Sequence, residues 1–135
     1  MDQINFVGAM IGGVAAFFLG GLWYSPLLFG NTWAEVCGLT SDQIKTASVA
    51  GMIGKTLPLS ILASLVFAAF LGREIDIVFG ASAGVAAGLF WVTGSLGINY
   101  AFEQKPFKLF LINGGYHTVQ FGLYGTIIGA TNSVF

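Results

Sequence analysis

Four long apolar stretches follow one another along the chain, separated by short polar segments. They cover about residues 5–28, 56–72, 77–102 and 107–131. A helix needs about 20 predominantly apolar residues to cross the hydrocarbon of a bilayer, and lipid-exposed backbone must satisfy its own hydrogen bonds. The pattern therefore predicts an all-α membrane protein, a bundle of four transmembrane helices that forms a single integral membrane domain over residues 1–135.

The polar segment between the first two stretches carries a helix start signal. Thr40, Ser41 and Asp42 stand before an amphipathic run, and residues of these types cap helix N-termini. We therefore expect a short cytoplasmic interfacial helix from Asp42 to about Lys55. Pro58 would then lie in the first turn of the second span, where its missing N–H costs little.

The positive residues predict how the helices are oriented. Lys45 and Lys55 lie in the first connector, Lys105 and Lys108 lie in the third, and the second connector contains only Arg73. Short connectors rich in Lys and Arg stay in the cytoplasm. Both termini are therefore expected outside.

Composition supports the membrane prediction and narrows the chemistry. Only 8% of the residues are charged, against about a quarter in soluble domains. A net charge of −1 argues against a nucleic-acid partner. One Cys and one His offer neither a metal site nor a catalytic triad. We therefore expect no enzyme activity, no cofactor and no metal, with the lipid bilayer as the main partner.

Small residues recur every four positions in the first and third stretches. The predicted helix-packing glycines are Gly8, Gly12, Gly20, Gly80, Gly84 and Gly88. This spacing leaves a shallow groove that lets another helix approach closely. One interpretation is packing inside a single bundle. The other, which we favour, is a homodimer or homotrimer through a glycine face, with other membrane proteins as further partners.

Polar side chains gather on the last two spans and the turn between them. The candidate ligand or pathway residues are Asn99, Tyr100, Glu103, Asn113, Tyr116, His117 and Gln120. Asn99 and Asn113 are each seven residues from Pro106, which predicts similar depths in a polar layer. Such residues need partners inside a bilayer. They form either interhelical hydrogen bonds that lock the bundle or the lining of a pocket or pathway.

Glu103 ends the third span on the side predicted to be cytoplasmic. It is either simply solvated or paired with Lys55 across the second and third spans. We retain Lys55 and Glu103 as a candidate cytoplasmic ion pair.

Two motifs resemble those of a bacterial family of small four-span membrane proteins of unknown function. The first is LWYSPLLFG followed by NTW, and the second is FEQKPFKLFLINGGYH. The matching positions are Trp23, Tyr24, Pro26, Gly30, Trp33, Phe102, Glu103, Lys105, Pro106, Leu109, Gly115 and Tyr116. The resemblance implies four helices in the bacterial inner membrane and supplies no activity, cofactor or substrate. Asn113 stands where some relatives have an acidic residue, which weakens a proton-relay role.

These observations favour a multi-pass membrane protein that acts as a binding, structural or accessory subunit of a membrane assembly. The alternative is a small transporter or channel whose path follows the polar face of the fourth span. The outer halves of the first and third spans contain mostly Gly, Ala, Phe and Val, which favours the first interpretation.

Overall fold

The computed structural model describes residues 3–135, and every regular element in that range is a helix. In chain order these are α1 (Phe6–Trp23), α2 (Gly30–Cys37), α3 (Ser41–Thr46), α4 (Val49–Leu71), α5 (Ile77–Ala86), the π-helix η1 (Ala87–Thr93), α6 (Gly94–Phe102) and α7 (Phe107–Thr131). The elements α5, η1 and α6 follow one another without a break and form a single rod over residues 77–102. The predicted all-α class is confirmed.

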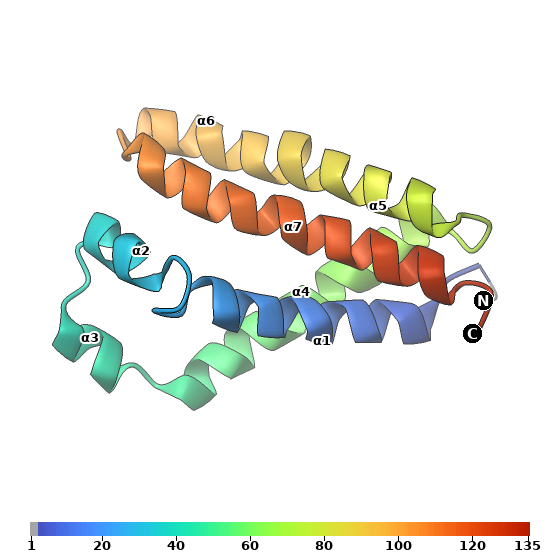
Figure 1. Cartoon of the computed structure of the whole chain (residues 1–135), viewed down its shortest axis with the longest axis horizontal. Coiled ribbons are helices and arrows are strands. Elements are labelled where there is room, and N and C mark those ends of the chain that lie inside the picture. Colours follow the sequence, from blue (N-terminus) through green and yellow to red (C-terminus); the bar gives the residue numbers. More distant parts are fainter. Residues whose placement is uncertain (1–2) are drawn as a thin grey trace.

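The long helices lie side by side with α7 between the others (Figure 1). On one side α7 packs against the α5–η1–α6 rod, and on the other it packs against α1 and, less extensively, α4. The first and last helices meet at one end, where Asn5 hydrogen-bonds to Asn132. The short helices α2 and α3 lie at the opposite end (Figure 1).

Three of these rods are long and apolar enough to cross a membrane: α1, α4 and the rod over residues 77–102. Large apolar side chains such as Phe70 and Phe90 are exposed along them, as expected for surfaces that face lipid. The fourth predicted span corresponds to α7, which is 25 residues long. Because α7 contains Asn, His, Gln and many Gly residues, it is less apolar than the other three, and its crossing of the bilayer stays a prediction.

The first apolar stretch ends earlier than predicted. Its helix stops at Trp23 rather than near residue 28, and the segment before α2 turns on itself, with the amide of Gly30 donating to the carbonyl of Ser25 at 2.9 Å. Pro26 cannot donate a backbone hydrogen bond and so favours an end to the helix here. The helix α2, which follows this turn, was not predicted from the sequence.

The single interfacial helix predicted for Asp42–Lys55 is wrong in its extent. The predicted cap is present, because Thr40 and Gln43 form a reciprocal capping box, but α3 ends at Thr46. Ser48 then caps a new helix by accepting from the amide of Gly51 at 3.0 Å. The second long helix therefore starts at Val49 instead of residue 56, and Pro58 lies inside it rather than in its first turn.

The glycine stripe of the third rod packs against α7 of the same chain. A Cβ built at Gly80 would overlap the carbonyl of Gly125, and one at Gly84 would overlap the carbonyl of Phe121. Gly88 is equally close to the backbone of His117. These glycines allow backbone-to-backbone contact within the bundle. Because α7 covers these glycines, they serve packing inside the bundle, and the predicted homodimer or homotrimer stays a prediction.

The glycines of α1 also face neighbours within the chain. A Cβ at Gly8 would meet Asn5 and Thr131, one at Gly12 would lie 3.0 Å from the Ser64 hydroxyl, and one at Gly20 would lie 3.0 Å from the Tyr116 hydroxyl. Both predicted glycine faces are therefore used for packing inside one bundle.

The π-helix keeps the third rod in contact with α7 along its full length. The positions that meet α7 are Gly80, Gly84, Gly88, Thr93 and Gly97. Their spacing is four residues everywhere except between Gly88 and Thr93, where it is five. A π-helical turn accommodates one additional residue. The extra residue thus returns Thr93 to the α7 face, where its hydroxyl donates to the carbonyl of Gly114 at 2.9 Å.

Candidate functional site

A network of amides closes the end of the bundle at which the first and last helices meet. Asn5 is fully buried. Its amide nitrogen donates to the Thr131 hydroxyl at 2.8 Å and to the Asn132 side-chain oxygen at 2.9 Å, while its own oxygen accepts from the amide of Gly8 at 2.8 Å. This group was not among the residues predicted from the sequence. The available signal was a lone Asn directly before an apolar helix, a common N-cap position.

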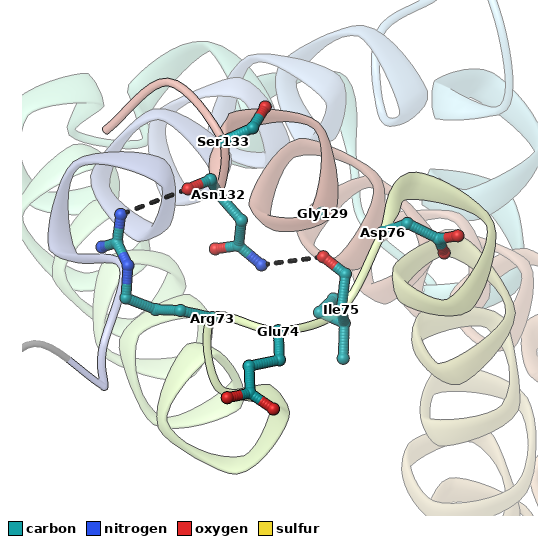
Figure 2. Close-up of a pocket in the computed structure, with 7 residues that line it drawn as sticks. All are labelled: Arg73, Glu74, Ile75, Asp76, Gly129, Asn132 and Ser133. Carbon is teal, nitrogen blue, oxygen red and sulfur yellow. Dashed lines mark hydrogen bonds between the residues drawn. The ribbon is translucent and has the colours of Figure 1, made fainter.

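A pocket of about 250 Å³ opens beside this network. It is lined by Arg73, Glu74, Ile75, Asp76, Gly129, Asn132 and Ser133 (Figure 2). The Arg73 guanidinium donates to the carbonyl of Asn132 at 3.3 Å, and the Asn132 side chain donates to the carbonyl of Ile75 at 3.1 Å. Glu74 points away from these groups (Figure 2), and Asp76 caps α5 by accepting from the amide of Phe79 at 2.8 Å. These contacts fasten the α4–α5 turn to the end of α7.

A one-way chain of hydrogen bonds crosses the middle of the bundle. His117 Nδ1 lies 2.6 Å from the Gln120 side-chain oxygen, and the Gln120 nitrogen donates to the Tyr124 hydroxyl at 2.7 Å. Tyr124 then meets Ser60 at 2.8 Å, and Ser60 donates to the backbone carbonyl of Gly13 at 2.8 Å. An amide oxygen only accepts hydrogen bonds, so Nδ1 of His117 is the donor. The predicted stripe of α7 therefore fixes α7 to α4 and α1.

One hydroxyl near this chain has no partner. The Ser64 side chain is completely buried, and its oxygen makes no hydrogen bond within residues 3–135. It lies where α4 crosses Gly12 of α1 at close range. An unpaired buried hydroxyl is costly, so Ser64 is a weak point of this helix crossing.

At the other end of the bundle, Asn113 joins two tyrosines from different helices. The Tyr24 hydroxyl donates to the Asn113 oxygen at 2.7 Å, and the Asn113 nitrogen donates to the Tyr100 hydroxyl at 2.7 Å. One residue earlier on α7, the carbonyl of Ile112 accepts from the indole of Trp23 at 2.9 Å. Asn113 thus ties the end of α1 to α6 and α7.

Aromatic rings surround this junction. Tyr24 makes edge contacts with Trp33 of α2 and with Tyr116 of α7, with ring centroids 5.2 and 5.6 Å apart. The Tyr116 hydroxyl donates to the carbonyl of Ala16 at 3.0 Å. We call the group of Trp23, Tyr24, Trp33, Tyr100, Asn113 and Tyr116 the end cluster. It holds α2 against α7.

The structure does not bring all predicted site residues together. Asn99 is exposed and does not share a layer with Asn113, so the prediction of an Asn99–Asn113 layer is wrong. The reason is rotation about the helix axis, because Asn99 lies on the face of α6 that points away from α7. Lys55 and Glu103 are both exposed, and their helices lie on opposite sides of the bundle (Figure 1). The structure therefore leaves them as separate surface charges.

Asn113 in the end cluster keeps hydrogen-bonding capacity. Asn113 is only partly buried. An Asn side chain offers two N–H donors and two acceptor lone pairs, and each of its polar atoms has one partner here. One donor and one lone pair therefore stay available beside several aromatic rings. No three His, Cys, Asp or Glu side chains of residues 3–135 lie close enough together to hold a metal.

Residues of the two sequence motifs meet in the end cluster. Trp23, Tyr24 and Trp33 come from the first motif, and Tyr116 and Gly115 come from the second, with a Cβ at Gly115 placed 3.1 Å from the Trp23 ring. Comparison with curated proteins and with solved structures found no match. A family model described as "Protein of unknown function (DUF1761)" matches residues 7–129. The chain therefore belongs to the DUF1761 family.

Proposed function

We propose that the protein is a multi-pass protein of the bacterial inner membrane and that α7 is its fourth span. A helix of 25 residues is about 37 Å long, which exceeds the ~30 Å of hydrocarbon. Its Asn113, Tyr116 and Tyr124 side chains bond groups outside α7, so lipid need not contact them. The four lysines lie in α3, in the early part of α4, before α7 and in its first turn. We assign this end of the bundle to the cytoplasm, with both termini outside.

We further propose that the protein is a binding or accessory subunit of a membrane assembly. The observation that carries this proposal is that His117, Gln120 and Tyr124 of α7 are hydrogen-bonded in series. Through Ser60 the series ends at a backbone carbonyl. The chain from His117 ends at the carbonyl of Gly13, and its Gln120 amide cannot pass a proton on. A transport path needs polar groups free to bind what moves along it, so this arrangement favours assembly over transport.

The proposed binding region is the end cluster together with α2, α3 and the turn before α2. The cluster fastens α2, while α3 has no buried residue. Leu27, Leu28 and Ile44 of this segment are exposed. Exposed apolar groups next to a partly free Asn suit contact with the membrane surface and with another membrane protein.

The test is purification from native membrane in mild detergent, with a matched variant. Asn113→Leu should lose a co-purifying partner while the chain stays folded and membrane-bound. Thr126→Val on the other half of α7 should keep the partner, because the Thr126 hydroxyl bonds only its own helix, at the carbonyl of Gly122. Reconstituted vesicles should pass no more protons or cations than empty ones. A flux that Asn113→Leu abolishes, with no partner recovered, would support the transporter instead.

A further inference from the structure

The α5–η1–α6 rod is the outermost long helix of the bundle. Among the long helices it packs mainly against α7, and it lies at the edge of the molecule (Figure 1). Its inner face is formed by the glycines that contact α7. Its opposite face is therefore free to meet either lipid or a further protein.

That opposite face carries a stripe of small and polar residues. The outer stripe consists of Ser82, Ala86, Trp91, Ser95 and Asn99, all of them exposed. Their spacing repeats that of the inner face, with the same additional residue across the π-helix. Elsewhere on the long helices the exposed residues are mainly Leu, Val, Phe and Ile. The outer stripe thus differs in kind from a lipid-facing surface.

Several polar groups of this stripe have no partner in the described chain. Thr118, Thr126 and Thr131 each satisfy a hydroxyl with the carbonyl four residues earlier. Ser82 and Ser95 take part in no such bond within residues 3–135. Both serines lie within about 12 Å of the midpoint of the 26-residue rod, inside the ~30 Å of hydrocarbon, where water cannot satisfy them.

Trp91, at the middle of the rod, is a further polar group without a hydrogen-bond partner. Its side chain is 73% exposed, and its indole N–H makes no hydrogen bond within residues 3–135. Tryptophans at lipid-facing positions normally sit at the membrane–water interface. A donor at this depth needs an acceptor from another protein surface.

We propose that the outer stripe is the contact surface for a second copy of this chain. This inference rests on the proposed crossing of the bilayer. About a two-fold axis along the membrane normal, two parallel rods place each residue next to its own copy. Self-pairing suits groups that both donate and accept, as the Ser hydroxyl and the Asn amide do. The Trp91 indole only donates, so its acceptor would be the Ser95 hydroxyl of the second copy, one turn along the rod. The stripe carries no charge that would repel itself, and Ala86 permits close approach.

Oxidative cross-linking in native membranes tests the surface. In a Cys37→Ser background, Ser95→Cys should give a covalent dimer of twice the chain mass as its main product. Leu62→Cys on α4, which is also exposed, should stay monomeric. No dimer from Ser95→Cys, an equal yield from both variants, or an adduct of any other mass would overturn the proposal.

A second pair of variants tests the contact without a cross-link. Ala86→Phe should shift the detergent-solubilised protein from dimer to monomer, whereas Ala69→Phe at an exposed position on α4 should leave the dimer intact. Dimers that persist in Ala86→Phe would contradict the inference. Alkaline carbonate extraction distinguishes a failure of the proposed bilayer crossing from a failure of the proposed dimer contact. Release of the chain from the membrane would contradict both proposals. A chain that stays in the membrane but gives no Ser95→Cys dimer would contradict only the dimer contact.

Discussion

Two asparagines close the two ends of the bundle in different ways. Asn5 is fully buried, and its amide donates to both Thr131 and Asn132 while its oxygen accepts from a backbone amide. Asn113 is partly buried and bonds to Tyr24 and Tyr100, each through a single polar atom. Asn5 is therefore saturated by neighbours, whereas Asn113 keeps bonding capacity and has aromatic rings around it.

This difference separates a structural closure from a candidate site. A saturated, buried amide has nothing left to offer a ligand, and its main effect is to fix the first helix against the last. A partly exposed amide can bind a further group at little desolvation cost. Variants at the two ends should therefore differ both in stability and in function.

The largest expected effect is the loss of the buried closure. Asn5→Leu leaves the Asn132 oxygen and the Gly8 amide without their Asn5 partner and removes the bond to the Thr131 hydroxyl. It should therefore lower the free energy of unfolding by about 2–3 kcal/mol. Unfolding by SDS titration in mixed micelles measures this change. Asn31→Leu, at an exposed position on α2, is the control and should change stability little. Equal losses in both variants would remove the distinction between the two ends.

A variant in the end cluster should lower the free energy of unfolding less than Asn5→Leu does, and should impair partner binding more. Asn113→Leu is expected to cost about 1 kcal/mol, as is typical of hydrogen bonds between membrane helices, while abolishing partner recovery. The double variant Tyr24→Phe with Asn113→Leu should lose less stability than the sum of the two single variants. The difference, a coupling of about 0.5–1 kcal/mol, is measured by the same titration. Strictly additive losses would mean that the 2.7 Å contact between them contributes nothing.

The sequence allowed the helical class, the family and the polar character of α7 to be predicted. Periodicity and residue type carry that information. Polar residues of a membrane helix, such as His117 and Gln120, must be paired with other protein groups because lipid offers them no partner. Asn99 was misplaced because distance from Pro106 predicts depth but not rotation about the helix axis. The break at Ser48 was missed because a cap within a helix-forming run is a weak local signal. The Asn5 network joins residues more than 120 positions apart, and no local pattern predicts such a contact.

Between the two ends, two serines lie one turn apart on α4. They test whether a buried polar side chain stabilises the fold only when it is hydrogen-bonded. Ser60 is buried and bonds both Tyr124 and the carbonyl of Gly13, whereas Ser64 is buried without a partner in the described chain. Ser60→Ala should lower the free energy of unfolding by about 1 kcal/mol. Ser64→Ala should raise it by about 0.5–1 kcal/mol, because it removes an unpaired hydroxyl. Each variant deletes one oxygen from the same helix, so helix propensity cannot explain opposite signs. A loss of stability in Ser64→Ala would show that the hydroxyl has a partner, such as a buried water.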